Sequence, residues 1–147
     1  MMRTVRGAPL LAVLGGAVIC LGAWLPWMTY FAGLYPLRGV IGLYGRLLIA
    51  AGIGAILLGG IDTAAPLRFR PRTVARAVGL LGLVVTSAAV WLFVGVRELA
   101  HIGATNAMFS PRPASGLLVV SVGGLVLILA ALRDRAGGGP EISPPGG

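Results

Sequence analysis

The sequence predicts an all-α integral membrane protein, a four-transmembrane-helix bundle with both termini on the cytoplasmic side. Only 11% of the 147 residues are charged and 57% are hydrophobic, whereas a soluble domain carries about a quarter charged residues. Four long apolar runs follow one another, and short arginine clusters separate them. Charge this sparse cannot cover the surface of a water-soluble globule, so lipid is the expected solvent.

Three of the four runs have the length of a membrane span. Residues 8–27, 77–96 and 114–132 contain no charged side chain. A hydrocarbon core of ~30 Å needs about 20 apolar residues in a helix. Because no backbone polar group can stay unpaired in lipid, each run is expected to be helical.

Two starting positions are considered for the second span. Its uncharged run, residues 47–61, is too short alone, so the helix must extend back past Arg46. A start at Leu43 leaves Arg46 one turn inside the boundary, where its long side chain can extend to water. A start at Gly39 places it about 10 Å deep. We therefore expect a span over 43–61, a transmembrane domain over 1–135, and a disordered cytoplasmic tail over 136–147, which is rich in Gly and Pro.

The twelve basic residues are all arginines and are unequally distributed. Eight fall before the first span, between the second and third, or after the fourth. The other four lie on the opposite side, at Arg38, Arg46, Arg97 and Arg112. This positive-inside pattern predicts cytoplasmic termini and accounts for the net charge of +8 without a nucleic-acid partner. The use of arginine alone, in a chain rich in Ala, Gly, Leu and Val, is typical of a GC-rich bacterial genome, so we expect a bacterial plasma membrane.

The chain offers little that resembles an active site. Its single cysteine, Cys20, excludes an internal disulfide or a cysteine metal cluster. Thr86, Ser87 and Ser121 lie within spans, where hydroxyls usually bond to their own or a neighbouring helix. The acids lie at span ends or in the tail, at Asp62, Glu98, Asp134 and Glu141. We expect no enzyme, no cofactor and no metal.

Small residues indicate where helices pack closely. Ala12, Gly16 and Cys20 recur every four residues, as do Ala51, Ala55 and Gly59. Such stripes allow two helix backbones to approach each other. Packing within the bundle is favoured here over a contact between molecules.

Nine of the ten aromatic residues are predicted at or near the outer end of the spans, and only Phe69 at the other. Most membrane proteins have an aromatic belt at each interface, so the outer residues are either interfacial anchors or an interaction patch. Arginines beside aromatic rings suit an acidic amphiphile or a partner's membrane helix. The candidate patch comprises Trp24, Trp27, Tyr30, Phe31, Tyr35, Arg38, Tyr44, Arg46 and Trp91. The belt also includes Phe93 and Phe109.

One ion pair is expected at the outer end. Glu98 is the only acid on that side, and an arginine partly inside the membrane is costly unless it is paired. We predict that Glu98 pairs with Arg46 and so connects the second span to the third.

The layout resembles a known group of proteins. Its four spans, the Leu-Pro-Trp end of the first span (residues 25–27) and the Gly-Leu-Tyr-Gly-Arg entry to the second (residues 42–46) are similar to small four-span actinobacterial membrane proteins, among them the Trp-biosynthesis-operon-associated membrane proteins. The resemblance implies an uncharacterised membrane protein and carries over no catalytic motif.

The expected function is that of a non-catalytic accessory or scaffolding subunit that interacts through its outer aromatic loop. The alternatives are an oligomeric transport or channel component and a lipid- or envelope-precursor-binding protein. The expected partners are membrane lipids and either another membrane protein or further copies of the chain.

Overall fold

The computed structural model describes residues 7–31, 34–64, 71–102 and 112–137, and it confirms a four-helix membrane bundle. The helices are α1 (Gly7–Trp24), α2 (Leu43–Ala64), α3 (Pro71–Ile102) and α4 (Ser115–Gly137). Each is long and apolar enough to cross a membrane. The start of α2 at Leu43 is the shallower of the two starts considered above. Most of the predicted tail lies outside the described residues, as do Arg3, Arg6, Arg68 and Arg70.

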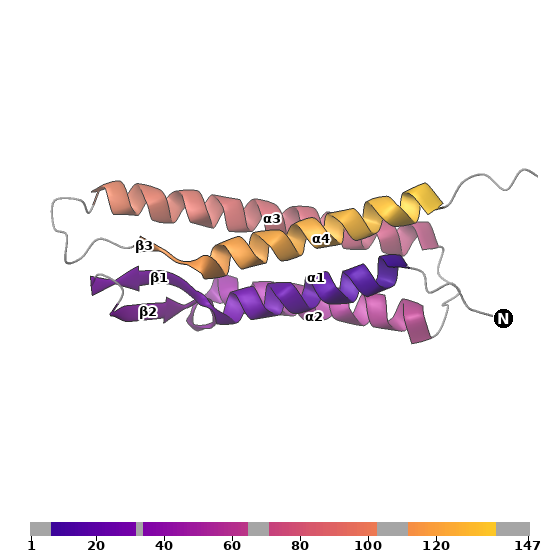
Figure 1. The fold of residues 1–147 in the computed structure, drawn as a ribbon, viewed down its shortest axis with the longest axis horizontal. Helices are drawn as coiled ribbons and strands as arrows, with labels where there is room; N and C mark the ends of the chain where they lie inside the picture. The colour runs from indigo at the N-terminus through magenta and orange to yellow at the C-terminus, as the bar shows by residue number, and fades with distance from the viewer. Residues whose placement is uncertain (1–6, 32–33, 65–70, 103–111, 138–147) are drawn as a thin grey trace, which may run out of the picture.

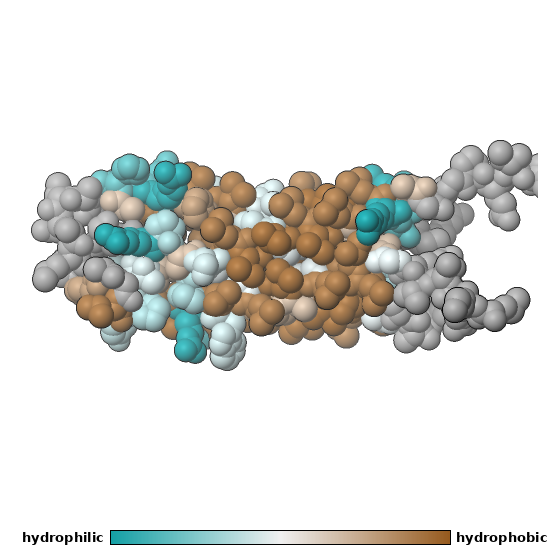
Figure 2. All heavy atoms as spheres, in the orientation of Figure 1, coloured by the Kyte–Doolittle hydropathy of each residue, from teal (hydrophilic) through white to brown (hydrophobic). Residues whose placement is uncertain are grey.

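The four helices do not all contact one another to the same extent. The central pair is α1 and α4; α2 packs on α1, and α3 packs on α4, whereas α2 and α3 touch each other much less (Figure 1). On the face shown in Figure 2, hydrophobic side chains form a band across the middle of the molecule, with hydrophilic ones towards both ends. We use the name apolar belt for this band.

The two ends of the bundle differ. The beginning of α1 and the end of α4 lie at one end, which we name the terminal end (Figure 1). A small sheet lies at the other, the sheet end. Helix α3 has 32 residues and therefore extends about 48 Å, so its last turns run alongside the sheet.

Glycines set the close approach of the packed helices. A Cβ atom at Gly52 of α2 would lie 2.7 Å from the Cys20 sulfur and 2.8 Å from the Gly16 carbonyl oxygen, both on α1. Between α3 and α4, a Cβ atom at Gly82 would lie 2.8 Å from the Gly124 carbonyl oxygen. The predicted small-residue stripe on α1 therefore packs inside the bundle, against α2.

The sheet was not expected from the sequence. Strands β1 (Pro26–Tyr30) and β2 (Tyr35–Arg38) form an antiparallel hairpin, and β3 (Arg112–Pro113) pairs antiparallel with the other side of β1. A 3-10 turn, η2 (Gly39–Ile41), connects β2 to α2. The outer aromatic loop of the sequence analysis thus contains two strands and a 3-10 turn beyond the ends of α1 and α2.

Proline closes both edges of this sheet. The strand order is β2-β1-β3, so β2 and β3 are the edges. Pro36 lies opposite Thr29, whose own backbone partner on the other side is Arg112. In an antiparallel ladder this alternation turns the Pro36 nitrogen outward, where it has no hydrogen to donate. Pro113 interrupts the other, two-residue edge, so neither edge readily accepts a further strand.

Candidate interaction site

Trp27 anchors the sheet to the helices. It is only 7% exposed, and its Nε1–H donates a hydrogen bond of 3.1 Å to the Gly22 carbonyl oxygen of α1. Its ring lies against Gly39 of η2 and Gly116 of α4, where a Cβ atom would overlap the indole. The Trp27 carbonyl oxygen accepts a hydrogen bond of 3.0 Å from the Ala114 N–H. Trp27 is therefore a structural core residue and is buried away from any partner.

The end of the β1–β2 hairpin is apolar and exposed. Phe31 is 41% exposed, Leu34 83% and Tyr35 66%; we name these three residues the hairpin tip. Phe31 adopts a positive φ of 53°, and the Leu34 N–H donates to its carbonyl oxygen at 3.2 Å, which closes the turn. Tyr30 is half-buried, and its hydroxyl lies 3.8 Å from the Met28 sulfur. The tip thus extends from a hairpin that Trp27 holds in place.

Two further contacts involve predicted patch residues. The Arg38 guanidinium carbon lies 5.9 Å from the centroid of the Trp24 ring, a distance suited to a cation–π interaction. Tyr44 at the start of α2 meets Trp91 of α3 edge-to-face, with ring centroids 6.5 Å apart. The second contact joins α2 and α3, the two helices that otherwise touch little.

Arg46 and Glu98 are not brought together. Both side chains are exposed, and the described part of the chain contains no ion pair between them. Helix α2 meets α3 through Tyr44, and residues two positions apart on a helix point to different sides. Arg46 therefore faces away from the helix that carries Glu98.

The predicted patch is therefore divided. Trp27 is buried, Phe31 and Tyr35 belong to the hairpin tip, Trp24 stacks with Arg38, and Tyr44 contacts Trp91. The described aromatic residues lie in the hairpin, at the end of α1, at the start of α2 or in the second half of α3. Phe69 and Phe109 lie outside the described residues.

Three polar side chains inside the spans have hydrogen-bond partners close by. The Thr86 hydroxyl donates to the Gly82 carbonyl oxygen at 2.8 Å, and the Ser121 hydroxyl donates to the Leu117 carbonyl oxygen at 2.9 Å. Both bonds run one turn back along the same helix, as the sequence analysis expected. The Cys20 thiol lies 3.8 Å from the Ile49 carbonyl oxygen of α2. These groups therefore contribute to helix structure and packing.

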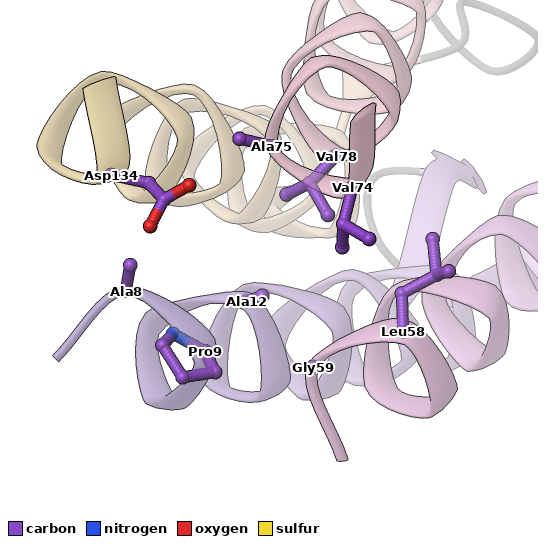
Figure 3. Close-up of a pocket in the computed structure, with 9 residues that line it drawn as sticks. All are labelled: Ala8, Pro9, Ala12, Leu58, Gly59, Val74, Ala75, Val78 and Asp134. Atoms are coloured by element: carbon purple, nitrogen blue, oxygen red, sulfur yellow. The ribbon is translucent and has the colours of Figure 1, made fainter. Parts of the chain in front are cut away.

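A small crevice opens at the terminal end. It has a volume of about 30 Å³, room for one or two water molecules. Figure 3 shows the Asp134 carboxylate of α4 directed towards Ala8, at the beginning of α1. The rest of the lining is apolar, including Leu58 of α2 and Val74 and Val78 of α3. A carboxylate beside a helix N-terminus is favourable, so a structural role accounts for Asp134.

Comparison of the chain with protein-family models, curated proteins and solved structures found no match. The resemblance to the small actinobacterial membrane proteins remains a prediction.

Proposed function

We propose that the protein is a non-catalytic accessory subunit of the bacterial plasma membrane that contacts a partner membrane protein through its hairpin tip. The observation that carries the proposal is the contrast within one hairpin. Trp27 at its base is 7% exposed and fixed by glycines, whereas Leu34 at its end is 83% exposed. A hairpin that is fixed at its base and carries exposed apolar side chains at its end is suited to contacting a partner.

The position of the tip also supports a protein contact. The tip lies at the far end of the sheet from Trp24, the last residue of α1. Five strand residues extend about 17 Å, more than the 5–8 Å that the headgroup region adds on each side of a bilayer. Exposed apolar side chains in water are characteristic of interaction surfaces. Because the hairpin is already folded, little ordering entropy opposes binding.

The hydrogen bonds of the hydroxyl groups inside the spans support a non-catalytic role. The Thr86 and Ser121 hydroxyls bond back to their own helices. A nucleophile needs a neighbouring base, and no described ionisable side chain contacts either hydroxyl. The small crevice beside Asp134 is too narrow for an organic substrate.

For the orientation we propose a cytoplasmic terminal end and an external sheet end. The first helix begins and the last one ends at the same end of the bundle. Eight arginines, in the N-terminal segment, the α2–α3 connection, the beginning of α3 and the end of α4, fall on that side by chain order, against four on the sheet side. The hairpin tip then faces the outside of the cell.

Site-specific photo-crosslinking in the native membrane tests the function. A photoreactive residue at Leu34 is expected to give one discrete adduct with a second polypeptide, whereas the same residue at Leu118, which is 56% exposed on α4, serves as the control. Replacing Tyr35 with serine is expected to weaken the Leu34 adduct and leave the amount of folded protein unchanged, because Tyr35 is 66% exposed.

Two outcomes contradict the proposal. An adduct joining two copies of this chain supports the oligomeric transport alternative instead. The absence of any adduct at Leu34 above the Leu118 control excludes a partner at the hairpin tip.

A further inference from the structure

Arg38, Arg46 and the exposed Trp24 lie at the junction between the sheet and the helices α1 and α2. Arg38 stacks on Trp24 at 5.9 Å. The Cys20 thiol contacts the Ile49 carbonyl oxygen, which fixes the register of α1 against α2. One turn further towards the sheet end, α1 reaches Trp24 and the antiparallel α2 reaches Arg46. This register places Trp24 and Arg46, both exposed, at a similar height along the two packed helices.

No carboxylate balances these two positive charges. Among the described residues, Glu98 is the only acid of the sheet end, and it lies on α3, the helix from which Arg46 faces away. The described residues include no ion pair to Arg38 or Arg46. Both guanidinium groups are on exposed residues and are therefore available to an external anion.

The surface below the arginines is apolar. Leu21 lies one turn from Trp24 on α1 and is 64% exposed, and Leu47 follows Arg46 on α2 and is 57% exposed. The first turn of α2 also contains no acidic residue, and its N–H groups lie at the positive end of the helix dipole. Positive groups above an apolar surface match a molecule that has an anionic head and a hydrocarbon tail.

We propose that Trp24, Arg38 and Arg46 form a binding site for the phosphate headgroup of an anionic phospholipid in the leaflet at the sheet end. Guanidinium groups bind phosphate oxygens in a bidentate manner. A zwitterionic lipid also carries a phosphate, but its own cation would lie beside the two arginines. The site is separate from the hairpin tip and does not depend on the proposed accessory function.

Tryptophan quenching by brominated lipids tests the site. The protein carries Trp91→Phe, so that Trp24 is its exposed tryptophan while Trp27 remains buried, and it is placed in nanodiscs of phosphatidylcholine and phosphatidylglycerol. Bromine is carried by one lipid at a time. We expect phosphatidylglycerol to be enriched about tenfold over phosphatidylcholine beside Trp24. In the Arg38→Gln/Arg46→Gln variant we expect no preference between the two lipids.

The control removes the same charge at the other end. Arg133→Gln/Arg135→Gln, at exposed positions of α4, is expected to leave the enrichment at Trp24 unchanged. The emission of buried Trp27, measured after Trp24→Phe and Trp91→Phe, reports whether the Arg38/Arg46 variant is folded. If that variant unfolds, Arg46→Gln alone is used and is expected to lower the enrichment at least threefold.

Three results would overturn the proposal. The first is equal quenching by the two lipids in the protein with both arginines. The second is unchanged enrichment in the folded arginine variants. The third is displacement by inorganic phosphate beyond the effect of sodium chloride at equal ionic strength, which would assign the site to free phosphate.

Discussion

Gly39 lies so close to the Trp27 indole that no side chain fits between them. We expect Gly39→Ala to push the ring away from Gly22 and Gly116 and to destabilise the protein by ~1–3 kcal/mol, the usual cost of overpacking. Thermal unfolding of the purified protein in detergent measures the change. Gly42→Ala is the matched control, because its Cβ atom meets nothing closer than the Gly39 carbonyl oxygen at 3.6 Å. Equal stability of the two variants would show that Trp27 is not held by Gly39.

Residue-level prediction from the sequence was limited by distance along the chain. The sequence analysis grouped Trp27 with the exposed aromatic residues because it stands between Trp24 and Tyr30. Its burial depends on Gly39 and Gly116, and the second of these is 89 residues later (116 − 27). Local composition contains no record of that contact. The hydrogen bonds of Thr86 and Ser121 were predicted correctly, since their partners are one turn away.

At the scale of the elements, two glycines of α2 provide a matched comparison. Gly52 faces α1, where a Cβ atom would meet Cys20 and Gly16, whereas Gly54 has nothing within 4 Å. We expect Gly52→Ala to lower the unfolding temperature by separating α1 from α2, at a cost of ~1–3 kcal/mol. Gly54→Ala is expected to be neutral or slightly stabilising, because alanine favours the helix. A Gly52→Ala variant as stable as Gly54→Ala would contradict the α1–α2 packing described here.

The sequence contains a recognisable pattern for part of the sheet, the β1–β2 hairpin, but not for β3. Pro-Trp-Met-Thr-Tyr and Tyr-Pro-Leu-Arg are separated by a short segment containing glycine, and aromatic residues are frequent in them. That pattern is typical of a hairpin, but the sequence analysis interpreted the aromatic residues as interfacial anchors or an interaction patch and predicted no strand. The two-residue β3 has no pattern of its own, since its pairing with β1 is entirely long-range. The long apolar helices carried a much stronger signal.

For the whole molecule, the proposed orientation makes a direct prediction. In a Cys20→Ala background, a cysteine at Leu34 is expected to react with a membrane-impermeant maleimide in intact cells. A cysteine at Ala136, near the end of α4, is expected to react only after the membrane is opened. The reverse pattern would place the sheet end in the cytoplasm and would exclude an external partner at the hairpin tip.

The number of helices and the approximate spans followed from hydropathy, because lipid permits few structures for an uncharged run of this length. The arrangement of the helices did not follow. Hydropathy does not distinguish a lipid-facing leucine from one facing another helix, so the weak α2–α3 contact was not predicted. The expected Arg46–Glu98 connection assumed that these two helices were close neighbours at that point.

The strand order also determines when the sheet can be completed during synthesis of the chain. β1 lies at the centre of the sheet, yet its second neighbour, β3, begins 82 residues after β1 ends (112 − 30). A ribosome adding about 5–20 residues per second needs on the order of ten seconds for that interval. During this interval, the β3 side of β1 is unpaired and Trp27 has no contact with Gly116. The sheet is therefore among the last parts of the protein to be completed, after α1, α2 and α3 have already been synthesised.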